Sequence, residues 1–251
     1  EAVPIIGALD ISGSMGIIAE YFAKEGLGTL FQGILDKKPV KYPHMMFMAY
    51  DDLNVDNPVA LQVSQFEADN RIVEQLTKIY VEGGGGGNSY ESDDIAWYFA
   101  GRHTEHDHMI KRGRRGLMYT IGDEGAPPYL KKAGMERIFG YKFEADVPAS
   151  LSLQEAQRKY DVYHVIIEQG AHASQFPDEV KKSWREALGQ HVIHLSDYKL
   201  LSETLVAAIA VAAGEDHATA ASGWGAAAGK VISRAVADLP RGVPAPKRLG
   251  K

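Results

Sequence analysis

Residues 4–15 read PIIGALDISGSM, and this stretch decides the fold. The apolar run at residues 3–9 is long enough for a buried strand, and Asp10 follows it directly. Residues 11–14 predict a tight turn, and the helical spacing of apolar residues after the turn predicts a helix. A buried strand that turns into a helix is the repeating unit of an α/β fold.

Three oxygen-bearing side chains leave the end of this strand together. Asp10 carries a carboxylate, and Ser12 and Ser14 carry hydroxyls on every second residue after it. Oxygen donors of this kind are the ligands that a hard cation such as Mg²⁺ prefers. We therefore interpret the turn as a metal site beyond the carboxyl end of the strand. The alternative is an ordinary strand-to-helix turn capped by a serine.

A second apolar strand also ends in acidic residues. Residues 116–122 (GLMYTIG) end at Asp123 and Glu124. In neighbouring parallel strands, Asp10 and Asp123 would meet at the crevice where open α/β sheets bind ligands. The sequence therefore favours a second carboxylate at the same edge of the sheet.

A glycine-rich loop is the third candidate segment. Five glycines at 83–87 precede Asn88, Ser89, Tyr90 and Glu91. By composition alone the loop is typical of a flexible linker. The helix predicted at 94–99 places the loop at a helix start within the domain, which favours a second ligand-bearing segment.

The remaining pattern alternates strands and helices. The stretch at 61–66 alternates apolar and polar residues, as a half-exposed edge strand does. Ser152 and Glu155 have the spacing of a helix-capping pair. Further strands are expected at 44–50, 162–167 and 191–195, and helices at 69–80, 127–138, 152–160, 177–188 and 199–213.

Composition excludes several classes of protein. The 251 residues carry a net charge of -6, which argues against broad nucleic-acid binding. The chain has no cysteine, which excludes disulfides, thiolate metal sites and cysteine nucleophiles. This absence suits a reducing compartment, and we expect a cytoplasmic location. The apolar run at 205–213 is too short to span a bilayer.

Three histidines, His103, His106 and His108, gather near the end of a predicted helix. Their spacing has no distant partner set of the kind that a zinc site requires, and several arginines and lysines surround them. We interpret this run as a solvated polar turn.

Residues 1–213 resemble a von Willebrand factor A (VWA, integrin I-like) domain with a metal-ion-dependent adhesion site (MIDAS), of a bacterial or phage type. The DISGS order at residues 10–14 carries the match, and Asp123 in its Gly-Asp-Glu setting matches the third motif in kind. The usual threonine of the second motif is missing. The loop is similar to a Gly-Gly-Gly-Asp-x-Pro-Glu variant, with Asn88 in place of Asp, Tyr90 in place of Pro, and Glu91 retained.

The resemblance implies a three-layer, doubly wound α/β fold. Its sheet is mostly parallel and six-stranded, with one antiparallel edge strand and helices on both faces, as in Rossmann-like folds. The implied metal ligands are Asp10, Ser12, Ser14 and Asp123. It stays open which of Asn88, Ser89 or Glu91 also contacts the metal.

The resemblance further implies binding rather than turnover. In this family Mg²⁺, with Mn²⁺ or Ca²⁺ as alternatives, accepts an Asp or Glu carboxylate from a partner protein. Neutral hydroxyl ligands keep the ion electrophilic toward that carboxylate. We expect an adaptor domain that is not an enzyme. By family analogy a MoxR-type AAA+ ATPase is one expected partner.

Rival functions fit the sequence less well. A metal-dependent hydrolase or phosphatase of the haloacid dehalogenase type would use Asp10 as nucleophile, but it needs a second Asp where Ser12 stands. A nucleotide-binding domain needs a phosphate-binding fingerprint that the chain lacks. A third alternative is a purely structural metal.

Residues 214–251 differ in composition from the rest of the chain. They are rich in Ala and Gly, and from Pro240 onward they are rich in Pro and carry four positive charges. We predict an extended or partly disordered C-terminal extension that serves as a partner-binding arm.

Overall fold

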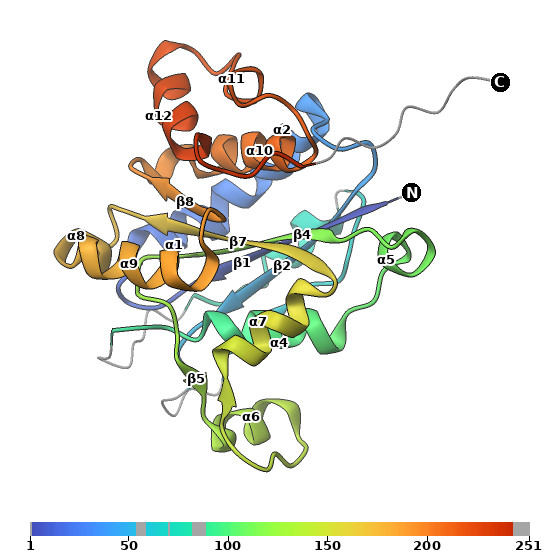
Figure 1. Cartoon of the computed structure of the whole chain (residues 1–251), viewed down its shortest axis with the longest axis vertical. Coiled ribbons are helices and arrows are strands. Elements are labelled where there is room, and N and C mark those ends of the chain that lie inside the picture. Colours follow the sequence, from blue (N-terminus) through green and yellow to red (C-terminus); the bar gives the residue numbers. More distant parts are fainter. Residues whose placement is uncertain (1, 54–58, 70, 82–88, 243–251) are drawn as a thin grey trace.

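The computed structural model describes residues 2–53, 59–69, 71–81 and 89–242. Its centre is a six-stranded sheet in the order β3-β2-β1-β4-β7-β8 (Figure 1). These strands are β1 (Val3–Asp10), β2 (Pro43–Tyr50), β3 (Leu61–Val63), β4 (Gly116–Gly122), β7 (Tyr160–Ile167) and β8 (Val192–Leu195). All neighbours pair in parallel except β3, which runs antiparallel to β2. The predicted sheet is confirmed.

The two faces of the sheet carry separate hydrophobic clusters. Successive side chains of a strand point to opposite faces, so Ile5 and Leu9 of β1 pack in one cluster and Ile6 and Ala8 in the other. Burying an aliphatic side chain of this size contributes about 1.5–3 kcal/mol. Helices cover both faces and complete the three layers (Figure 1).

The helices divide between these two clusters. The first cluster includes residues of α1 (Ile17–Tyr21), the π-helical segment η1 (Phe22–Gly26), α2 (Leu27–Lys37), α3 (Arg71–Leu76), α10 (Leu201–Ala212), α11 (His217–Ala220) and α12 (Ala226–Val236). The second includes residues of α4 (Asp93–His103), α6 (Lys132–Phe139), α7 (Ala149–Gln157), α8 (Ala171–Gln175) and α9 (Pro177–Leu188). The shorter elements are α5 (Asp107–Arg112), β5 (Tyr129–Leu130), β6 (Val147–Pro148) and the 3₁₀ turn η2 (Tyr198–Leu200).

Two predicted helix starts are wrong. The helix expected at 127–138 begins only at Lys132, because Tyr129 and Leu130 pair with β6 as a short second sheet. The helix expected from Ser152 begins at Ala149, whose N–H donates to the Pro128 carbonyl. Ser152 therefore lies inside α7, fully buried, and does not cap it.

The C-terminal region is also different from the prediction. Residues 217–220 and 226–236 form the helices α11 and α12 and are not extended. Ile232, Val236 and Leu239 are each at most 4% exposed and pack in the first cluster. Their spacing is that of one helix face. The sequence analysis missed this pattern because the surrounding residues are mostly Ala and Gly. Residues 243–251 lie outside the described residues.

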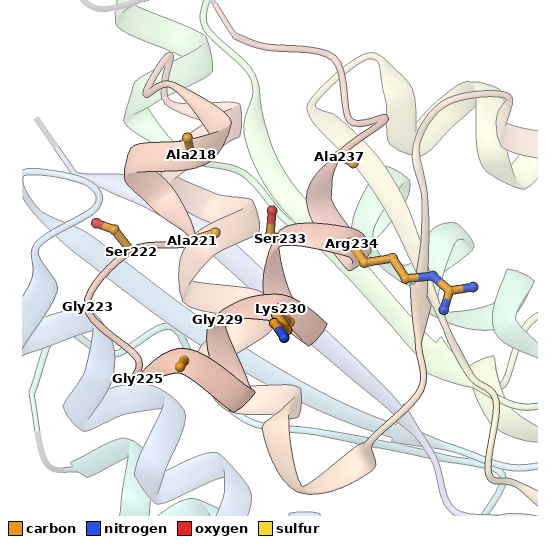
Figure 2. A pocket seen from close by; sticks show the side chains of 11 residues that line it. Ala218, Ala221, Ser222, Gly223, Gly225, Gly229, Lys230, Ser233, Arg234 and Ala237 are labelled. Atoms are coloured by element: carbon orange, nitrogen blue, oxygen red, sulfur yellow. The ribbon is translucent and has the colours of Figure 1, made fainter.

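The pair of C-terminal helices leaves a shallow hollow on the surface. Its volume is about 710 Å³, and its lining is mainly alanine, glycine and serine. Figure 2 shows Lys230 and Arg234 among these small side chains. In the described part of the chain, no helix is both long enough and apolar enough to cross a membrane.

Candidate metal centre

Three neighbouring parallel strands end at one edge of the sheet, and each is followed by a carboxylate. Asp10 ends β1 and lies opposite Tyr50, the last residue of β2. Asp51 follows Tyr50, and Asp123 follows the last residue of β4. All three carboxylates are at most 1% exposed. The parallel pairing therefore places acids from distant parts of the sequence at the crevice predicted for a ligand.

The two serines and Asp123 are in direct contact. The Ser12 and Ser14 hydroxyl oxygens are 3.0 Å apart, and the Ser14 hydroxyl donates to Asp123 Oδ1 at 2.6 Å. The Ser12 N–H donates to Asp10 Oδ1 at 2.8 Å, which closes the turn. The predicted first and third motifs thus lie within hydrogen-bonding distance of one another.

The loop after β7 and the start of α8 hold Asp123 from the other side. The His172 N–H donates to Asp123 Oδ2 at 2.8 Å, and the Ala171 N–H donates to the Ser14 carbonyl at 3.1 Å. A Cβ on Gly170 would lie 2.2 Å from Asp123 Cβ, so only glycine leaves room for this carboxylate. Sequence reasoning missed this loop, and the Gly at 170 was its only local signal.

The second predicted segment divides into three parts. Asn88 lies outside the described residues. Ser89 is exposed, and its carbonyl accepts the Gly125 N–H at 3.1 Å. Tyr90 forms a parallel bridge with Gly125, which ties this segment to the residues that follow Asp123. Glu91 is only 2% exposed, so of the two open candidates that the structure describes it is the buried one.

Asp93 is a further buried acid that the sequence analysis did not select. The Tyr50 hydroxyl donates to Asp93 Oδ1 at 2.5 Å, and His164 Nδ1 lies 3.5 Å from the same oxygen. Burial raises the pKa of Asp93 to about 7, and burial lowers the pKa of His164 well below its usual range. His164 is a fully buried ring that stacks on Trp184, and its lowered pKa favours the neutral form.

The charge balance of the site fits a bound cation. Burial raises the pKa of Asp10 well above its usual range, against the opposing effect of its hydrogen bonds from Ser12. Burial, followed by the negative charges of Asp10 and Glu124, raises the pKa of Glu91 to about 11. Among the described residues, Glu91 Oε2 and Glu124 Oε2 are buried without a hydrogen-bond partner. Acidic oxygens in this state are stabilised by a dication.

The chemistry of the donors also narrows the kind of metal. Within the described ranges, no three acidic or histidine side chains converge closely enough to hold an ion by themselves. The contacting set consists instead of two neutral hydroxyls with carboxylates beside them. Hard cations such as Mg²⁺ accept such oxygen ligands and keep several waters.

Comparisons with known proteins give a likeness in structure. The chain matches no protein-family model. No curated protein matches it either. Among solved structures, the pilus adhesin SpaC of Lactobacillus rhamnosus GG superposes with a TM-score of 0.53 at 10% identity, over 82% of this chain and 30% of that one.

Two further structures are similar. A von Willebrand factor type A protein from Catenulispora acidiphila has a TM-score of 0.50 at 16% identity, over 86% of this chain and 44% of its own. Proximal thread matrix protein 1 from the mussel byssus, with a zinc-occupied MIDAS motif, has a TM-score of 0.50 at 12% identity. The match covers 81% of this chain and 46% of that one. The chain spans less than half the length of each, and at these identities the likeness extends to the fold alone.

Proposed function

The chain has a von Willebrand factor A-like fold, and from this premise we propose that it is a metal-dependent protein-interaction domain. One observation carries the proposal. The hydroxyls of Ser12 and Ser14 and the carboxylate of Asp123 form a continuous chain of contacts beside buried Asp10, at the carboxyl ends of two adjacent parallel strands.

Each residue of this set has a defined task. Ser12 and Ser14 would offer neutral oxygens to a bound metal, and Asp10 and Asp123 would supply negative charge. The N–H groups of Ser12 and His172 fix the orientation of the two carboxylates before any metal binds. Such preorganised groups lose little entropy on binding. Bound Mg²⁺ supplies an electrophilic centre that attracts a carboxylate from outside the chain.

The proposed partner is a protein that offers an Asp or Glu side chain. A carboxylate that meets the metal fixes the orientation of the partner, and the surrounding loops add contact area. A MoxR-type AAA+ ATPase is one such partner that we propose from family analogy. Mn²⁺ or Ca²⁺ in place of Mg²⁺ is compatible with the same oxygen donors.

Calorimetric titration of the metal-free chain with Mg²⁺ tests the metal centre. Wild type is expected to bind, and Ser12→Ala and Asp10→Ala are expected to lose most of the affinity. Ser152→Ala is the matched control, because Ser152 is also a fully buried serine but lies in α7. Equal Mg²⁺ affinity in wild type and Asp10→Ala would contradict the proposal.

Assays of turnover separate the binding function from the rival hydrolase. We expect no metal-dependent phosphatase or nucleotide hydrolysis activity from the purified chain. Turnover that depends on Mg²⁺ and disappears in Asp10→Ala would favour the hydrolase instead.

A further inference from the structure

An apolar groove lies beside the metal centre. Its volume is about 710 Å³. One wall comes from the first helical region and the other from α3 and the residues after it, with Gly16, Ile17, Ala23, Val73, Leu76 and Tyr80 among the lining residues.

Large apolar side chains are exposed along this groove. Ile17 is 72% exposed, Tyr80 61% and Val73 37%. Leaving such groups in water is unfavourable, and a contiguous exposed set marks an interaction surface more often than chance packing. The groove therefore has the surface chemistry of a docking site.

The walls of the groove are held in place without a ligand. The Gln62 side chain accepts the Tyr80 N–H at 2.9 Å and donates to the Tyr80 carbonyl at 2.8 Å, so β3 fixes the backbone of this wall. Leu76 is only 4% exposed and joins the lining to the core. A preformed groove reduces the entropy that an occupant loses on binding.

The charges of the lining residues define the chemistry of the occupant. Among the described lining residues, only Glu20 and Lys24 are charged, and these two form an ion pair with each other. The groove thus has no net charge to attract an ion. An uncharged aliphatic or aromatic side chain is the group that it fits.

The groove begins near the candidate metal centre, because its lining includes Gly16 and Ile17, which follow Ser14 closely along the chain. Ile17 follows Ser14 by three residues, so their Cα atoms are at most about 11 Å apart. An extended peptide advances about 3.3 Å per residue. One partner segment therefore has the length to reach both places.

We propose that this groove receives an apolar side chain of the same partner segment whose carboxylate binds at the metal centre. The recognised segment has an Asp or Glu and, about two to four residues away, a Leu, Ile, Met or Phe. This inference rests on the proposed function, and it adds to that function the class of sequence that the domain selects.

Selection from a random peptide library tests it. The whole chain is immobilised with Mg²⁺, and bound peptides are released with EDTA. We expect the released peptides to share an acidic residue with a large apolar residue at a fixed spacing. One enriched peptide is then synthesised and titrated against wild type and the variants Ile17→Gln and Tyr80→Gln.

Ile110→Gln is the matched control, because Ile110 is 66% exposed but lies on α5. We expect Ile17→Gln to weaken peptide binding about tenfold, since one buried apolar side chain contributes on that scale. Ile110→Gln should leave peptide binding unchanged. Mg²⁺ affinity should be the same in all four proteins, because none of these substitutions removes a proposed ligand.

Other outcomes would overturn the inference in distinguishable ways. In one such outcome, EDTA releases acidic peptides that share no apolar residue and that bind Ile17→Gln and wild type with equal affinity. This result would refute the role of the groove and leave the proposed function standing. A failure to obtain any EDTA-released peptide would refute both. Self-association of the chain that Ile17→Gln abolishes would assign the groove to a second copy.

Discussion

The candidate metal centre and the C-terminal helix pair are built on opposite principles. At the metal centre, Asp10, Glu91 and Asp123 are buried acids, and Glu91 retains a carboxyl oxygen with no partner among the described residues. In α12, the buried residues are Ile232, Ala235 and Val236, whose apolar side chains pack on the core and need no hydrogen-bond partner.

The buried groups of the two regions therefore contribute differently. Those of α12 stabilise the fold, and those of the candidate metal centre are suited to binding a ligand. Apolar burial stabilises the fold whether or not a ligand is present. Buried acids cost free energy until a cation offsets their charge, so their contribution depends on the ligand. Substitutions in the two regions should therefore change different measurements.

The largest expected effect is on stability. Ile232→Ala should lower the free energy of unfolding by about 2–5 kcal/mol, because it removes fully buried aliphatic volume. Chemical denaturation measures this loss. The Mg²⁺ affinity of the folded variant should equal that of wild type, and a parallel loss of affinity would break the separation between the two regions.

The next effect is on metal-dependent stabilisation. At a Mg²⁺ concentration 100 times its Kd, wild type should gain about 2.7 kcal/mol, a rise in melting temperature of roughly 5–10 °C. Asp10→Asn should lose this rise. In EDTA the variant should melt no lower than wild type, because the substitution removes a carboxyl group that burial disfavours as an anion. A lower melting point in EDTA would contradict this account.

A smaller effect is expected from Gly170→Ala. The added Cβ would displace Asp123, which holds Ser14, and should weaken Mg²⁺ binding about 10-fold or more. Titration calorimetry measures the change. Gly229→Ala in α12 is the matched control, since its Cβ meets only an ordinary contact at 3.6 Å. Equal affinities for both variants would show that Gly170 has no positioning role.

The smallest effect concerns the cap of the helix pair. The Asp216 carboxylate accepts hydrogen bonds from the N–H groups of Ala218 and Thr219. These bonds lower the pKa of the carboxyl group below 3.8, and the bond from Thr219 has the largest effect. Because the folded-state pKa is depressed, the stabilisation is present at neutral pH and is lost as the pH falls through that lowered pKa.

The variant Asp216→Ala makes this measurable. Its melting temperature should lie below that of wild type at neutral pH. This decrease should be smaller than the decrease in the melting temperature of Ile232→Ala. The difference in melting temperature between Asp216→Ala and wild type should narrow as the pH falls through the lowered pKa of Asp216. A difference that stays constant with pH would assign the loss to something other than the charged cap. Mg²⁺ affinity should not change, because Asp216 is not a proposed metal ligand and accepts its hydrogen bonds from the first turn of α11.

The sequence determined the buried strands and the first motif by itself. Apolar runs at β1, β2 and β4 are long enough to specify buried strands, and Asp10, Ser12 and Ser14 are placed by their spacing alone. The edge strand β3 was predicted for the same reason, because its alternation is local. These features depend on periodicity and turn-forming residues, which can be recognised within a few neighbouring positions of the sequence.

Only the tertiary structure decided the rest. The contact between Ser14 and Asp123 joins residues 109 positions apart, and Gly170 and His172 come to Asp123 from another strand end. The helix α12 is stabilised by burial on the core, which overrides the linker-like composition of its segment. Packing between distant segments sets these features, because their free energy comes from neighbours that the local sequence does not contain.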